Sequence, residues 1–378
     1  MKKFVRAVIL LFAVILIFAC FCIPAYAEGD GMEEYKNFVD NIPKDIRDKL
    51  PFSVYSENGE EIAEGVREMS GVKFLLGELF GALLSGIKDA VPYICRVIGL
   101  LVIASLIKVV GSSLWGESGG VSALISRLCI FGAVISGGMG CIEGVGEYFD
   151  NLFALALSYI PLSAALYSMG GNISAAVASS SSFGIILTLC ELIFTYTVFP
   201  VFCFCTCINI ASCFDASPSI SAISGVVKKN YIFLLSLIMA ILCVSISAQT
   251  FISAKADNFT MRGAKFVIAS FIPHFGGSVS QSLGNVASSV ELLRGAVGVS
   301  GVIIILLMLI PTVIEIAVIR LLYSFASGIA GMIGCTSESG MLSEISTLYG
   351  YLLSVCAISS SVFIIAFGLL AKCACAVG

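Results

Sequence analysis

Eight stretches of this chain are apolar over about twenty residues, the length that an α-helix needs to cross a bilayer. Hydrophobic residues make up 58% of the 378 and charged residues only 12%, about half of the roughly 25% usual for a soluble domain. Such segments are stable in lipid as α-helices, because a helix satisfies its backbone N–H and C=O groups by internal hydrogen bonds. The sequence therefore predicts an all-α, polytopic transmembrane helix bundle of about seven to eight segments, which are 91–110, 122–142, 152–168, 183–207, 231–251, 266–282, 299–321 and 347–371.

The first 27 residues have the pattern of a secretory signal peptide. A basic start precedes an apolar run, and the small residues Ala25 and Ala27 fit the recognition pattern for cleavage after Ala27. The alternative is an uncleaved membrane anchor. In either case the acidic segment 28–71 is expected outside the cytoplasm. It is too short to bury much core alone, so we expect it to lean on the membrane body or on a partner.

A short amphipathic stretch, 72–90, comes before the membrane body 91–378. Its apolar residues recur at helical spacing with charged residues around them, which predicts a helix lying in the membrane interface. The apolar positions are Leu76, Leu79, Phe80, Leu83 and Ile87.

An internal repeat is a further prediction for the membrane body, with units 122–210 and 231–321. Each unit has a proline, a glycine pair, a serine-rich stretch and then a second proline; the members are Pro161, Gly170, Gly171 and Pro200, and Pro273, Gly276, Gly277 and Pro311. Repeat-built transporters show paired segments of this kind around their pathway. The alternative is chance, because small residues and proline are common in membrane helices. Three crossings per unit, or two with a re-entrant hairpin, both remain open, and the basic residues favour three.

Two carboxylates lie inside long apolar runs. Glu191 falls in 183–207 and Glu315 in 299–321, where an ionisable group is costly and often functional. Each is a candidate for a polar pathway, for a bound cation or for proton transfer. The alternative is a buried carboxylate that a neighbouring helix satisfies. With the prolines and glycines of the repeat, Glu191 and Glu315 form the candidate pathway or packing residues.

Signatures of enzymes are scarce in the sequence. It has no HExxH pair of zinc-binding histidines and no GxxxxGK[ST] loop for nucleotide phosphates. It also lacks the basic stripe of nucleic-acid-binding proteins. Cys203, Cys205 and Cys207 alternate in an apolar run, where packing explains them better than a metal site does. We therefore expect neither catalysis, nor a cofactor, nor a metal.

The most distinctive stretch begins at Ser253, with SAKADNFTMRGAK, FVIASFIPHFGGSVSQSL and then VELLRGAVGVSGVI. Together with the signal, the acidic segment and the apolar body, this run resembles the stage III sporulation protein AE family of endospore-forming bacteria. The order and hydropathy of nearly the whole chain agree with that family. The specific part of the likeness is Ser253–Ile303.

The resemblance implies a multi-pass protein of the mother-cell membrane that surrounds the forespore. Proteins of that family are expected to join other stage III sporulation proteins, among them a separate ATPase subunit, in a channel or secretion-like complex that sustains the forespore. Stage II sporulation protein Q would meet the complex from the forespore side. No catalytic residue carries over. A self-sufficient secondary transporter and a non-conducting scaffold remain the alternatives.

Overall fold

The structure, a computed structural model, describes residues 31–51, 59–114, 119–169, 173–214, 223–245, 247–248 and 276–375. Within these ranges the chain is almost entirely helical and has no strand. The elements are α2 (Gly31–Asp40), α3 (Lys44–Arg47), α4 (Gly59–Met69), α5 (Val72–Leu114), α6 (Gly119–Met169), α7 (Ile173–Ile193), the π-helix η3 (Phe194–Val198), α8 (Phe199–Phe214), the helix Ile223–Ser245, α10 (Gly276–Met332) and α11 (Thr336–Cys375).

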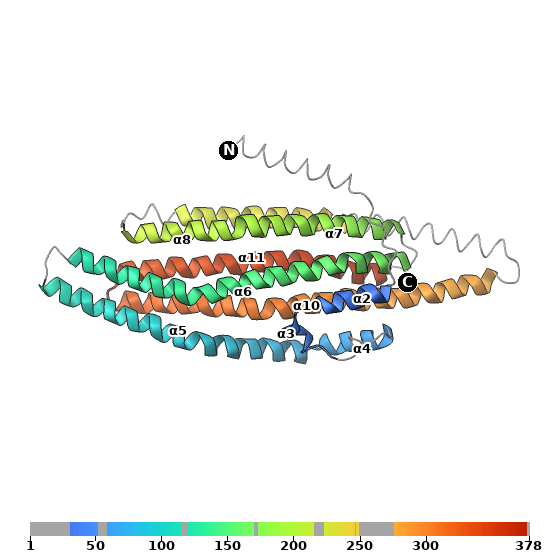
Figure 1. The fold of residues 1–378 in the computed structure, drawn as a ribbon, viewed down its shortest axis with the longest axis horizontal. Helices are drawn as coiled ribbons and strands as arrows, with labels where there is room; N and C mark the ends of the chain where they lie inside the picture. Colours follow the sequence, from blue (N-terminus) through green and yellow to red (C-terminus); the bar gives the residue numbers. More distant parts are fainter. Residues whose placement is uncertain are drawn as a thin grey trace, which may run out of the picture.

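The long helices run side by side along the longest axis of the molecule (Figure 1). The end of α5 and the start of α6 lie at one end of the bundle, and the end of α6 and the start of α7 lie at the other, so these helices are antiparallel. Six helices of the described ranges are long and apolar enough to cross a membrane by their length and composition. For the residues that the structure describes, the prediction of a helical fold with several such segments is confirmed.

Two pairs of predicted segments are single helices in the structure. The amphipathic stretch 72–90 and the crossing 91–110 form α5, of 43 residues. The crossings 122–142 and 152–168 form α6, of 51 residues. The acidic residues between the latter two, Glu143, Glu147 and Asp150, are all exposed and recur at helical spacing. They therefore lie on an outer face, where charge does not interrupt the backbone hydrogen bonds of the helix.

The acidic segment packs on the bundle, which is one of the two predicted alternatives, the other being contact with a partner. α2 packs against α6, and α4 packs against α10. Phe38 of α2 is 1% exposed, and its ring centroid lies 6.2 Å from that of Phe367 on α11. The side chain of Lys49 contacts Glu78 of α5 in an ion pair. The short helices thus bury their apolar faces on the end of the bundle where α5 begins (Figure 1).

α10 and α11 form the most extensive helix pair of the core. Gly301 of α10 is buried where it meets Phe367, and a Cβ at this glycine would lie 1.9 Å from a ring carbon of Phe367. The two helices can therefore approach this closely only because position 301 has no side chain, a device typical of helix packing in membranes.

Candidate functional site

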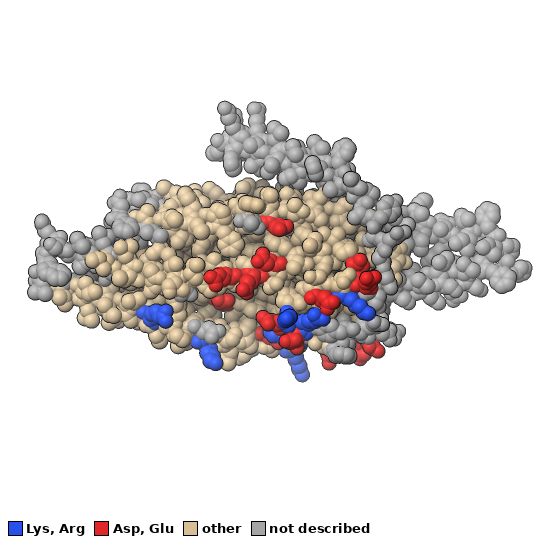
Figure 2. All heavy atoms as spheres, viewed as in Figure 1, with Lys and Arg blue, Asp and Glu red and all other residues tan. Residues whose placement is uncertain are grey.

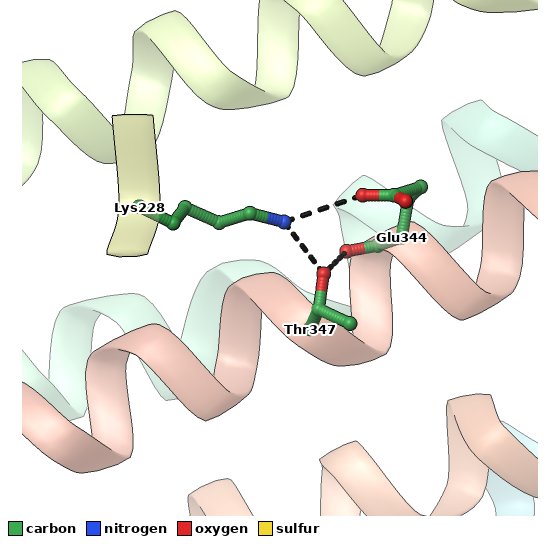
Figure 3. A network of polar contacts seen from close by, with 3 residues as sticks. All are labelled: Lys228, Glu344 and Thr347. Carbon is green, nitrogen blue, oxygen red and sulfur yellow. Dashed lines mark hydrogen bonds and ion pairs between the residues drawn. The ribbon is translucent and has the colours of Figure 1, made fainter. Parts of the chain in front are cut away.

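A buried lysine joins the helix Ile223–Ser245 to α11 (Figure 3). Lys228 is 6% exposed. Its Nζ lies 3.3 Å from Oε2 of Glu344 and donates a hydrogen bond of 2.5 Å to Oγ1 of Thr347. Thr347 in turn donates its hydroxyl proton to the carbonyl oxygen of Glu344, at 2.7 Å. A charged amine in an apolar bundle is stable only with such partners, because an unpaired buried charge is very costly.

A second ion pair joins α6 to the first turn of α11. Nε of Arg127 lies 3.4 Å from Oε1 of Glu338, whose side chain is only 6% exposed. Arg127 is near the start of α6 and Lys228 near the start of its helix, so both pairs lie at the same end of the bundle (Figure 1). The N-terminal part of α11 thus supplies the carboxylates for two basic residues of other helices.

Three tyrosines form a polar cluster deeper in the bundle. The hydroxyls of Tyr93 on α5 and Tyr323 on α10 contact each other, and each lies 3.0 Å from the carbonyl oxygen of Val134 on α6. Tyr349 of α11 donates to the carbonyl oxygen of Gly138, one turn further along α6, at 3.4 Å. Four helices therefore meet around two backbone carbonyl groups of α6. A buried hydroxyl that finds such a partner avoids the cost of desolvation.

Glu315, one of the predicted pathway residues, lies on α10 and is half-buried. It faces α6, because a Cβ at Gly144 would lie 3.5 Å from its Oε2. The structure thus places Glu315 against α6, six residues along that helix from Gly138 of the tyrosine cluster.

Glu191, the other predicted carboxylate, is exposed near the end of α7. Directly after α7 the chain widens into the π-helix η3, and Pro200 follows as the second residue of α8. Pro200 has no N–H to donate to the carbonyl four residues earlier, and a π turn is one way in which a helix absorbs such a defect. The structure gives no contact between Glu191 and Glu315, so it does not bring the two predicted carboxylates together.

The other predicted site residues are scattered along the chain. Pro161 is half-buried inside α6, and Pro311 is exposed inside α10. Gly276 and Gly277 are the first residues of α10. Pro273 and the cleavage residues Ala25 and Ala27 lie outside the described residues. Of the two later prolines of the predicted repeat, Pro200 follows a π turn, whereas Pro311 lies within a regular α-helix.

The polar contacts of the interior join different helices of the bundle. Every contact described above links side chains of different helices or a side chain to a backbone carbonyl. No group of three His, Cys, Asp or Glu residues in the described ranges is arranged to hold a metal ion. Cys205 is buried, whereas Cys203 and Cys207 share an exposed face of α8. The sequence analysis did not identify the partners Glu338 and Glu344 or the tyrosine cluster. The sequence indicated them only by the polar residues that accumulate early in α11.

Comparison with known proteins identifies a matching family and one similar protein. The model of a family described as stage III sporulation protein AE matches residues 56–374. The stage III sporulation protein AE of Bacillus subtilis (strain 168) is 26% identical over 220 residues, which are 57% of this chain and 54% of that protein. The aligned part therefore spans about half the length of that relative. No solved structure matches the chain.

Proposed function

This chain belongs to the stage III sporulation protein AE family, and from that premise we propose that it is a membrane subunit of a sporulation channel or secretion-like complex. In this proposal it is a multi-pass protein of the mother-cell membrane around the forespore, and it is needed for forespore development. In the same proposal the signal peptide is cleaved, and the long apolar helices anchor the mature chain.

The observation that carries the proposal is the extent of the family match. It begins before α4, includes α5 to α10 completely and continues to the last turn of α11. The whole bundle therefore takes part in the likeness, not an isolated helix. The ion pairs and the tyrosine cluster support a rigid membrane body, since they lock α5, α6, α10, α11 and the helix Ile223–Ser245 together.

The proposed role is structural and conductive, without catalysis. The energy for transport would come from the separate ATPase subunit of the complex, because this chain has no phosphate-binding loop of its own. Other stage III sporulation proteins would contact the bundle, and stage II sporulation protein Q would approach from the forespore side. The docked helices α2 to α4 would then face the space between the two membranes.

A compartment-specific rescue experiment tests the proposal. Deletion of the gene should block development after the forespore has been engulfed, and expression of the wild-type chain in the mother cell alone should restore spores. Rescue by expression in the forespore alone, or normal sporulation of the deletion strain, would refute the proposed role. Solute uptake into liposomes by the purified chain alone would instead favour a self-sufficient secondary transporter. Rescue by a chain substituted at both Glu191 and Glu315 would favour a non-conducting scaffold.

A further inference from the structure

An apolar stripe is exposed on the outer face of α5, in its first half. Its members recur at helical spacing and are between 37% and 64% exposed; they are Leu76, Leu79, Phe80, Leu83, Leu84 and Ile87. The inner face of the same helix meets α10, since a Cβ at Gly86 would lie 3.3 Å from Ile314. Six large side chains in a row are more than the isolated exposed apolar residues that a protein surface normally carries.

The position of the bilayer can be read from the rest of the surface. Towards the other end of the bundle, large apolar side chains are exposed on α5, between Val102 and Val110, and on α6, between Ile125 and Met139. The ion pair of Arg127 lies at that end. A hydrocarbon layer of about 30 Å that ends at Glu143, the first of three exposed carboxylates of α6, begins about twenty residues earlier in that helix, near Ala123.

The apolar stripe of α5 therefore lies beyond the lipid. At about 1.5 Å per residue, its members Ile87 to Leu76 are about 40 to 57 Å from the end of α5 at Leu114. The layer ends at Glu143, about 36 Å from the start of α6 at Gly119. Because α5 and α6 meet at their Leu114 and Gly119 ends (Figure 1), the two distances are measured from the same level. The stripe begins where the hydrocarbon stops, so another surface must cover it.

The outer face of α6 offers that surface at the same level. Glu143, Glu147 and Asp150 are exposed and share one face of α6, and the apolar residues Ala154 and Leu157 continue it. Figure 2 shows a group of acidic side chains midway along the visible face of the body, whereas basic and acidic side chains lie together towards its lower edge, where α5 runs. Within the described part of the chain none of the three carboxylates forms an ion pair.

The two faces complement each other in both charge and apolar character. The exposed Lys88 follows the α5 stripe and lies about 39 Å from Leu114, while Glu143 to Asp150 lie about 36 to 46 Å from Gly119. Phe80 is at about 51 Å and Ala154 at about 52 Å. Copies in one membrane have the same orientation, so residues at the same level meet. Lysine then meets carboxylates, and apolar residues meet apolar residues.

We propose that the α5 stripe of one copy docks on the outer face of α6 in a second copy, just beyond the membrane surface. Because two different faces meet, the contact is heterologous, and a rotation about the membrane normal that closes gives a ring. Each copy then covers the apolar stripe of its neighbour and pairs the neighbour's Lys88 with its own carboxylates. This assembly is independent of the function proposed above.

Disulfide cross-linking of the full chain in membranes tests the contact. In a cysteine-free background, Phe80→Cys with Ala154→Cys should give dimers and higher species after mild oxidation. Each substitution alone should give none, and mixing the two single variants should give dimers only. Phe80→Cys with Ile125→Cys is the matched control, because Ile125 is exposed on the same helix as Ala154 but about 44 Å nearer to the start of α6, and it should not cross-link.

Charge exchange provides the second measurement. Lys88→Glu should lower the cross-linked fraction about tenfold, and adding Glu147→Lys should restore it. Lys229→Glu, at an exposed lysine of another helix, should leave the fraction unchanged. Absence of cross-links in a double variant that is inserted at normal levels would overturn the proposal. Cross-linking of Phe80→Cys alone would also overturn it, since that result requires two α5 stripes to face each other.

Discussion

The pair of Lys228 and Glu344 predicts unequal effects for the loss of its two members. The lysine side chain is 8% exposed and the glutamate side chain 32% exposed. Glu344→Ala leaves the ammonium group buried with only the hydroxyl of Thr347, which should lower the free energy of unfolding by about 3–5 kcal/mol. Lys228→Met leaves a carboxylate that water can reach, so its loss should be only about 1 kcal/mol.

Two further variants isolate the charge effect from the change in shape. Lys228→Met combined with Glu344→Leu removes both charges and fills the space with apolar groups, so most of the stability lost in Glu344→Ala should return. Lys229→Met removes the neighbouring exposed lysine and should change the stability by less than about 0.5 kcal/mol. The stability of this variant measures the effect of removing one positive charge that is not buried.

The assay is reversible unfolding of the purified protein in mixed micelles, followed by circular dichroism as the denaturing detergent increases. The predicted order of stability is wild type and Lys229→Met, then the double variant and Lys228→Met, and last Glu344→Ala. Equal losses for the two single truncations would refute the reasoning from burial. A double variant as unstable as Glu344→Ala would show that shape, rather than an uncompensated charge, sets the cost.

Three further predictions concern packing, processing and topology. Gly301→Ala should destabilise the bundle by about 1–3 kcal/mol in the same assay, because its Cβ would overlap Phe367, whereas Gly328→Ala, with no atom within 4 Å, should be neutral; equal effects would contradict the packing argument. N-terminal sequencing of the membrane-extracted protein should find Glu28 first, and detection of Met1 would show an uncleaved anchor. In a cysteine-free background, an impermeant thiol reagent added outside should label Ser56→Cys and miss Ser113→Cys; labelling of both would exclude a crossing between them.

The membrane class of the fold could be predicted from sequence, because a helix that crosses a bilayer requires a long apolar run and such runs are visible in the sequence. The ends of the helices could not. The sequence predicts 122–142 and 152–168 as separate segments, but Glu143, Glu147 and Asp150 between them share one exposed face and the helix continues. Composition reports how polar a segment is, whereas continuity depends on where its polar residues point.

The candidate site was predictable only as single residues. Glu315 stood out as a carboxylate in an apolar run, and it does face other helices of the bundle. Lys228 and Glu344 are 116 positions apart, and no spacing rule connects residues that far apart on different helices. Each of them lies near a helix end, where a charge in the sequence is usually solvated. Their pairing follows from helix packing, which one sequence without structure does not contain.

The position of Phe38 on α11 has a consequence for the order of assembly. α2 leaves the ribosome before all the long helices, yet its aromatic partner Phe367 belongs to the last of them. α6 can cover most of the apolar face of α2 as soon as α6 has been inserted, because α2 packs mainly on that helix. The ring of Phe38, however, lacks its contact with Phe367 until α11 follows. A chain that stops before α11 therefore leaves Phe38 incompletely covered, and its full burial requires the complete bundle.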